Sequence, residues 1–295
     1  MDFKVELKKK ASYIEGVLKE YMPEEVGYQQ TVLKAMNYSL GAGGKRLRPI
    51  LVLETCKLVG GDEEEAISFA VAIEMIHTYS LIHDDLPALD NDDLRRGRAT
   101  SHVVFGEAMA ILAGDALLNY AFDIMLKGSI GRENPEKYLK AIYAISKNAG
   151  IYGMIGGQVV DVESENKKID KDKLDYIHKN KTAAMMVGCM SAGALVGGAD
   201  EEQLSCIVEY AEKIGLAFQI VDDILDIVGD QEKLGKNIGS DIYNNKSTYP
   251  SLLGLEKSRE IAKELIVDAK KCLDGKFENK EFLDGLADYI ISRDH

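Results

Sequence analysis

The chain has 295 residues, of which 46% are hydrophobic, so it can bury a substantial core. Its formal net charge of -13 argues against nucleic acid as a partner, because a phosphate backbone calls for a basic surface. The four cysteines include no CxxC pair, so neither a zinc site nor a disulfide framework is predicted. The N-terminus lacks the apolar core of a signal peptide, and we find no apolar run of the about 18 residues that a membrane span needs. We therefore expect reduced thiols and a soluble, cytoplasmic protein with no membrane span.

Helical patterns dominate the chain, and the prolines fall at helix ends or first turns. Ser247 or Thr248 can cap a helix that begins near Pro250. The other predicted helices cover residues 5–21, 29–40, 50–59, 63–86, 106–126, 135–150, 171–195, 201–228, 258–273 and 280–292. No alternating strand pattern is present, and no linker-like segment divides the chain. The sequence thus predicts an all-α fold with a single domain over residues 1–295.

A first acidic cluster follows the apolar helix that ends near residue 84. It gathers Asp84, Asp85, Asp90, Asp92, Asp93, Arg95, Arg96 and Arg98. In a straight helix Asp90 would lie off the face of Asp84, but Pro87 should distort the backbone and bring the two carboxylates together. His77 lies two turns before Asp84 on nearly the same face. The alternative interpretation is a charged loop between helices with Asp–Arg pairs.

A second acidic cluster, Asp222, Asp223 and Asp226, shares one stripe of a helix with Gln219. The rest of this helix is apolar, which is typical of a buried helix. Burying three unpaired carboxylates is costly, and a divalent cation would compensate them. Oxygen ligands favour magnesium, manganese or calcium over zinc. The alternative is a solvated acidic face.

Several basic residues could bind an anion. Lys45, Arg46 and Arg48 follow a glycine loop at a helix start, where free backbone donors stabilise negative charge, although the pattern is not a Walker A loop. Arg95 and Arg96 offer forked donors suited to phosphate oxygens. Each single lysine could equally be a solvated surface group. The other basic or polar candidates are Lys179, Lys181, Thr182, Lys236 and Lys246.

From about Gln30 onward the chain resembles the trans-prenyl diphosphate synthases. The motifs that carry the resemblance include GGKRLRP, IHTYSLIHDDLPALDNDDLRRG, GGQVVD, HKNKTAAM, GLAFQIVDDILD and DIYNNKSTYP. It implies a helical bundle around a central cavity, usually a homodimer. The implied reaction condenses isopentenyl diphosphate with dimethylallyl and geranyl diphosphate. Bacterial members that form farnesyl diphosphate are the most similar, and formation of geranylgeranyl diphosphate is the alternative within the family.

The resemblance also implies roles for particular residues. About three magnesium ions would hold the allylic diphosphate on both aspartate motifs: Asp84, Asp85, Asp90, Asp222, Asp223 and Asp226. These aspartates and Lys181 are the expected catalytic residues. The expected contacts to the allylic substrate are Arg95, Lys181, Thr182, Gln219, Lys236 and Lys246. The expected contacts to isopentenyl diphosphate are Lys45, Arg48, His77 and Arg96.

Product length should depend on Tyr79 and its neighbour Ser80, because the resemblance places a bulky aromatic floor five positions before Asp84. On a helical wheel Ser80 is aligned better with Asp84 than Tyr79 is, so the wheel alone only permits this role for Tyr79. The tail, Arg293 to His295, is less basic than the resemblance implies, which leaves open whether it closes the site. A non-catalytic helical subunit or metal-binding protein is the rival class, and intact aspartate motifs with basic partners disfavour it. A terpene cyclase would not need a second phosphate site.

Overall fold

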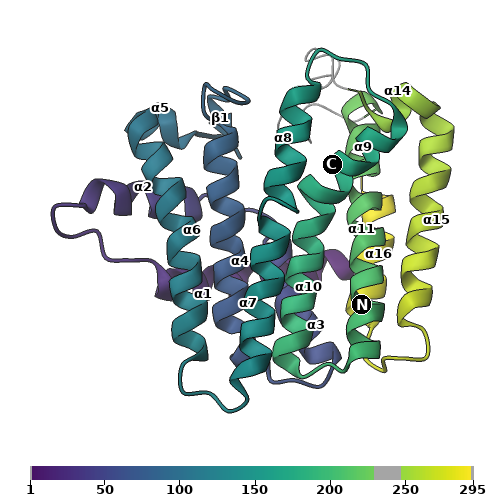
Figure 1. Ribbon diagram of the computed structural model, residues 1–295, viewed down its shortest axis with the longest axis horizontal. Helices are drawn as coiled ribbons and strands as arrows, with labels where there is room; N and C mark the ends of the chain where they lie inside the picture. The colour runs from purple at the N-terminus through teal and green to yellow at the C-terminus, as the bar shows by residue number, and fades with distance from the viewer. Residues whose placement is uncertain (1, 229–246, 294–295) are drawn as a thin grey trace.

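A computed structural model describes residues 2–228 and 247–293, and its regular structure is almost entirely helical (Figure 1). The prediction of an all-α fold is confirmed for these residues. A short antiparallel hairpin, β1 (Leu94–Arg95) and β2 (Arg98–Ala99), is the exception within them. The helices are α1 (Phe3–Tyr21), α2 (Gln30–Leu40), α3 (Leu47–Leu58), α4 (Glu63–Asp84), α5 (Ser101–Phe105), α6 (Glu107–Ser129), α7 (Pro135–Ala149), α8 (Met154–Ser164), α9 (Lys171–Ile177), the π-helical turn η1 (His178–Ala183), α10 (Ala184–Gly197), α11 (Glu201–Val228), α14 (Tyr249–Leu253), α15 (Leu255–Leu273) and α16 (Glu281–Ser292).

Local capping explains where several helices begin. The side chains of Asp2 and Asp62 each accept a hydrogen bond from a backbone N–H in the first turn of α1 and α4. Thr248 and Ser251 form a reciprocal capping box at α14, with Pro250 in the first turn. Of the two predicted caps for this helix, Thr248 is therefore the one used. These short-range signals are why most predicted boundaries lie within a few residues of the observed ones.

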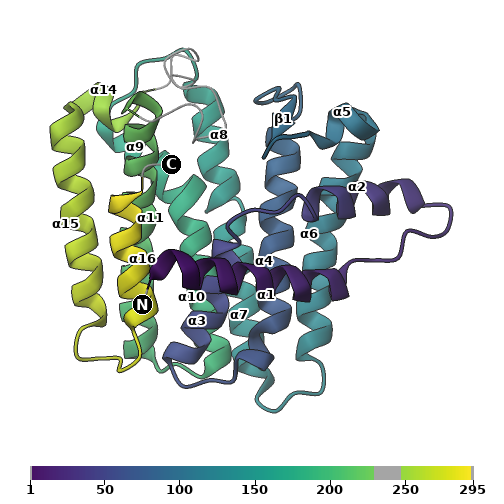
Figure 2. The same cartoon turned by 180° about the vertical axis from the view of Figure 1, so that it is seen from behind.

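The long helices stand side by side, and α1 and α2 cross one face of them, the face turned toward the viewer in Figure 2. Helix α4 is central and packs against α3, α6 and α10, so it is buried on nearly all sides. Its one deeply buried acid, Glu74, pairs with Arg46 at 2.6 Å, and both side chains are 2% exposed. The pair fixes the start of α3 against the middle of α4. The C-terminal ends of α4 and α11, which carry the two aspartate motifs, lie at the same end of the bundle (Figure 1).

The structure differs from the predicted elements in three places. The expected helix over 171–195 is divided by the π-helical turn His178–Ala183, and residues 151–162, for which no helix was predicted, largely form α8. Gly157 explains why α8 packs so closely on this turn, because a Cβ there would lie 2.2 Å from the backbone nitrogen of Lys181. Helix α4 ends at Asp84, two residues before the predicted end, since Pro87 disfavours a helical conformation at the residue before it.

Among the described residues, two helices, α4 and α6, are long and apolar enough to cross a membrane by length and composition, which the sequence analysis did not anticipate. In α4, 72% of the most apolar window is buried, as in a core helix. In α6 the buried share is 39%, so its outer side presents apolar residues. All four cysteines are free, as predicted.

Candidate active site

A cavity of about 700 Å³ lies between α4, α6, α8 and the π-helical turn. Asp84 and Lys181 supply charges to its lining, while Tyr79 lies about 7.5 Å before Asp84 along α4. The predicted central cavity beneath the first aspartate motif is therefore present. Its other walls are mainly apolar, with Leu81, Leu89, Leu118, Met154, Ile155, Val159 and Val162.

The first aspartate motif lies at the end of α4. The N–H of Asp90 donates to the backbone carbonyl of Asp84 at 2.8 Å, so the chain after Pro87 turns back as expected. Burial raises the pKa of Asp84 to about 6, and the neighbouring Asp90 and Asp85 charges act in the same direction. Asp85 is buried and bonded to Arg95, with 2.5 Å between Nη2 and Oδ1. This end of α4 thus concentrates negative charge that one arginine only partly compensates.

The second aspartate motif lies in the last turns of α11. Asp223 and Asp226 are buried, and the Asp222 side chain is 36% exposed. Asp223 accepts hydrogen bonds from the N–H of Tyr249 at 3.0 Å and from Gln219 at 3.3 Å. Asp223 therefore also holds the start of α14 against α11. Its position in the aspartate motif did not indicate this structural role.

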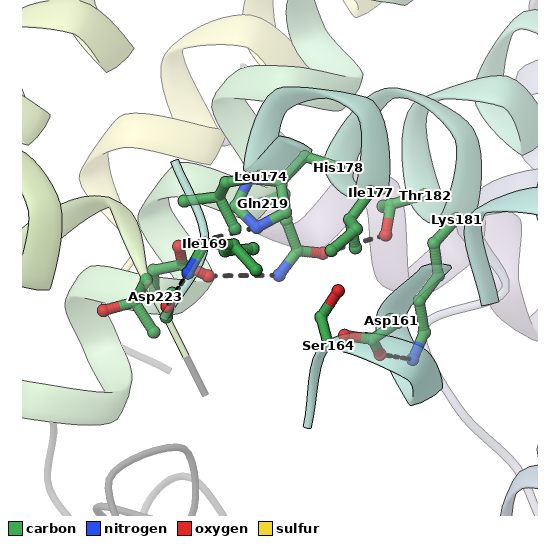
Figure 3. A pocket seen from close by; sticks show the side chains of 12 residues that line it. Asp161, Ser164, Ile169, Leu174, Ile177, His178, Lys181, Thr182, Gln219 and Asp223 are labelled. Atoms are coloured by element: carbon green, nitrogen blue, oxygen red, sulfur yellow. Dashed lines mark hydrogen bonds and ion pairs between the residues drawn. The ribbon is translucent and has the colours of Figure 1, made fainter. Parts of the chain in front are cut away.

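The π-helical turn joins the two motifs through Lys181 and Thr182, which line both the main cavity and a second pocket beside α11 (Figure 3). Thr182 donates to Gln219 at 2.8 Å, and Gln219 bonds to Asp223. Lys181 pairs with Asp161 at 2.6 Å. Although burial opposes it, the charges of Asp161, Asp84 and Asp90 raise the pKa of Lys181. The two acidic clusters thus flank one short segment of chain.

A basic cluster surrounds His77. Arg48 donates to Nε2 of His77 at 3.2 Å, and Arg96 donates to the backbone carbonyl of Gly43 in the glycine loop. Burial and four arginines, at positions 46, 48, 95 and 96, lower the pKa of His77 well below its usual value. Lys45 is exposed on the same loop. Like charges gathered in an acidic protein form a site suited to a polyanion.

Some site residues lie elsewhere or were missed. Lys236 and Lys246 lie outside the described residues, as do Asp294 and His295. Asp161, inside the GGQVVD motif, had no assigned role, and the structure makes it the partner of Lys181. Arg293 was unassigned too: it donates to Asp222 at 2.5 Å and stacks on the Phe218 ring. The contact was not predicted from the sequence because the two residues are 71 positions apart.

The carboxylates suit a hard divalent cation. Within residues 2–228 and 247–293 no three His, Cys, Asp or Glu side chains are grouped closely enough to hold a metal ion by themselves. The donor set is nonetheless all oxygen, and the charge of Asp90 contributes to the raised pKa of both Asp84 and Asp85. A cation that shared these oxygens would offset the burial of Asp84 and relieve the repulsion from Asp90 and Asp85, which together raise its pKa.

The sequence pattern of the polyprenyl synthetase family matches residues 29–282, and the chain belongs to this family. The predictions of a prenyltransferase and of the isoprenoid synthase type of fold are confirmed. Among its relatives, the farnesyl diphosphate synthase of Geobacillus stearothermophilus is 48% identical over 96% of this chain and 95% of the relative. Geranylgeranyl pyrophosphate synthase 3 of Arabidopsis thaliana is 46% identical, covering 99% and 82% of the two chains. A solved FPP/GFPP synthase from Zymomonas mobilis is similar at a TM-score of 0.86 and 38% identity, with 98% and 99% covered.

Proposed function

We propose that this chain condenses isopentenyl diphosphate with dimethylallyl and then geranyl diphosphate to make farnesyl diphosphate. The cavity of about 700 Å³ carries the proposal, because it offers charged groups for diphosphates at the end of α4 and apolar walls for a prenyl tail. The relatives named farnesyl diphosphate synthase, at 46% and 48% identity over nearly the whole chain, support this product. We also propose that residues 1–295 form one functional domain.

The proposed chemistry follows from where the charges lie. Arg95 and Lys181 hold the allylic diphosphate, and their positive charge stabilises the anion as its bond to carbon breaks. The residues that would hold magnesium are the two aspartate motifs, Asp84, Asp85, Asp90, Asp222, Asp223 and Asp226. When bound, about three magnesium ions would supply further positive charge to the departing diphosphate.

The second substrate would be held by Arg48, Arg96 and Lys45, beside the neutral His77. This arrangement brings the double bond of isopentenyl diphosphate to the allylic carbocation, and the apolar cavity walls keep water away from that cation. The tail of the growing product extends along α4 toward Tyr79, a residue that is 6% exposed. The Tyr79 ring limits the length of that tail.

Turnover of radiolabelled isopentenyl diphosphate by Asp84→Asn and Asp226→Asn tests the proposal. The turnover of each variant should be lower than that of the wild type by about a hundredfold or more. Removing one preorganised electrostatic contact to a transition state typically has an effect of this size. Asp123→Asn, which changes an exposed carboxylate paired with Lys127, is the matched control and should keep the wild-type rate. Near-normal turnover in both motif variants would overturn the metal-binding role.

Geranylgeranyl diphosphate is the second candidate product, since geranylgeranyl synthases are among the relatives at 46% identity. Tyr79 lines the cavity, and a bulky ring at this position would limit the tail along α4, which supports the shorter product. Chromatography of the dephosphorylated products separates the two chain lengths. A main product of 20 carbons would overturn the assignment to farnesyl diphosphate and leave the prenyl transfer intact.

We also propose that the protein is a cytoplasmic homodimer. Apolar side chains are exposed on neighbouring helices α6 and α7: Ile111, Leu112, Leu126, Leu139 and Tyr143. An exposed apolar surface of this kind is typical of a protein–protein interface. We infer that a second copy of the chain binds there. Sedimentation should give twice the chain mass of 32.5 kDa, and Leu112→Asp should lower it. A wild-type monomer at micromolar concentration would contradict the proposal.

A further inference from the structure

His83 lies one helical turn after Tyr79 on α4, and both side chains line the main cavity. The two rings meet edge to face, with 5.7 Å between their centroids and an angle of 79° between their planes. This is a favourable arrangement for aromatic rings. The imidazole therefore lies against the Tyr79 ring, on the side nearer to Asp84.

Helix α6 fixes the His83 ring from the other side. Nε2 of His83 donates to the backbone carbonyl of Ile111 at 3.1 Å, and a carboxylate oxygen of Asp115 lies 4.0 Å from the same nitrogen. Gly114 makes room for this contact, because a Cβ at that position would lie 2.1 Å from Nε2. Since a carbonyl only accepts, Nε2 carries the proton in this arrangement. The imidazole, whose side chain is 28% exposed, thus lies between α6 and Tyr79 and contacts both.

We propose that His83 is a positioning residue for product length: it holds the Tyr79 ring across the cavity and so sets where elongation stops. This inference rests on the proposed function. Tyr79 is buried in the core, and His83 is its neighbour on the side of Gly114, so without the imidazole the ring could turn toward α6 into the space that the imidazole leaves. The cavity would then lengthen along α4 and accept one more isoprene unit.

His83→Ala tests this proposal, with the ratio of 20-carbon to 15-carbon product as the readout at saturating isopentenyl diphosphate. We expect that ratio to rise about two- to tenfold over wild type, the range that the loss of one aromatic pair gives. In a Tyr79→Ala background His83→Ala should change the ratio little, because the ring that it positions is already absent. An unchanged ratio in the single variant, or an equal rise in both backgrounds, would overturn the proposal.

Leu118→Ala provides the matched control, because Leu118 lines the same cavity from α6. Any rise in the ratio that it causes should persist in the Tyr79→Ala background, since it removes wall volume directly. Should His83→Ala fail to fold, His83→Gln keeps a donor for the Ile111 carbonyl while removing the ring, and it should raise the ratio as well. The same chromatogram also tests the proposed function itself. If the wild-type protein makes no 15-carbon product, the synthesis of farnesyl diphosphate is refuted.

Discussion

Replacing Arg293 with alanine should release a carboxylate that metal binding needs. The guanidinium donates to Asp222 at 2.5 Å and to the backbone carbonyl of Phe218 at 2.8 Å, and it stacks at 3.9 Å from the Phe218 ring centroid. Its side chain is only 3% exposed. In the absence of metal, Arg293 therefore occupies one of the oxygens that the second aspartate motif offers.

The size of the effect follows from these contacts. A hydrogen bond between charged groups contributes about 1.5–3 kcal/mol. Because the Asp222 side chain is 36% exposed, solvent screening favours the lower end of that range. Losing a competitor worth about 1.4 kcal/mol should tighten metal binding about tenfold. The variant should also unfold more easily without metal, since the stacking on Phe218 contributes about 0.5–2 kcal/mol.

Calorimetric titration with magnesium, in the presence of inorganic diphosphate, measures this affinity without turnover. Urea denaturation of the metal-free protein measures the stability. Arg259→Ala is the matched control, because that arginine forms an exposed pair with Glu256. Unchanged or weaker magnesium binding by Arg293→Ala would refute the reasoning, and would indicate that Arg293 orients Asp222 for the metal instead of competing with it.

Three further predictions concern single side chains. Lys181→Ala should lower turnover about a hundredfold, while Asp161→Asn, which removes only the partner of that lysine, should cost less. His77 stays neutral in the folded protein because burial and four arginines lower its pKa, so stability is lost as the pH falls below about 6.5. His77→Gln should remove about 1.4 kcal/mol of the difference in unfolding free energy between pH 7.5 and 5.5, measured with urea. Burial raises the pKa of Cys56 and Cys189 to about 12, so iodoacetamide at pH 8 should leave both unmodified in the folded protein, as mass spectrometry can check.

For each of these three predictions, one result would contradict it. Equal losses for the lysine and aspartate variants would mean that the ion pair, and not the lysine charge, matters for turnover. A pH dependence that His77→Gln leaves unchanged would assign the lost stability to other groups. Rapid labelling of Cys56 without denaturant would show that the packing around α3 opens readily.

The sequence predicted those parts of the site that depend on local rules. The stripe of Asp222, Asp223 and Gln219 follows from helical periodicity, and the return of Asp90 toward Asp84 follows from Pro87. Both arrangements are present in the structure. Short-range backbone preferences were sufficient for each.

The contacts that the sequence did not predict join residues far apart in the chain. Arg293 reaches Asp222 across 71 positions, and Asp161 reaches Lys181 from the glycine-containing helix α8. No periodicity encodes such pairs, because they depend on how α8 and α16 pack on the other helices. The π-helical turn was missed for a related reason: its residues, HKNKTA, carry no signal that distinguishes a π-helical from an α-helical turn, and the surrounding packing favours one residue more per turn.

That turn has a consequence for how the chain tolerates insertions and deletions. An α-helix advances about 100° per residue, so one residue more or less changes the facing of every side chain that follows. The wide π-helical turn accommodates one extra residue, so removing the half-buried Asn180 would let residues 171–197 form one regular helix in which Tyr176 and Met185 keep their relative facing while the residues of the turn itself move. Lys181 and Thr182 would then point away from Asp161 and Gln219. A single-codon deletion here should therefore abolish turnover while preserving the helical circular dichroism spectrum.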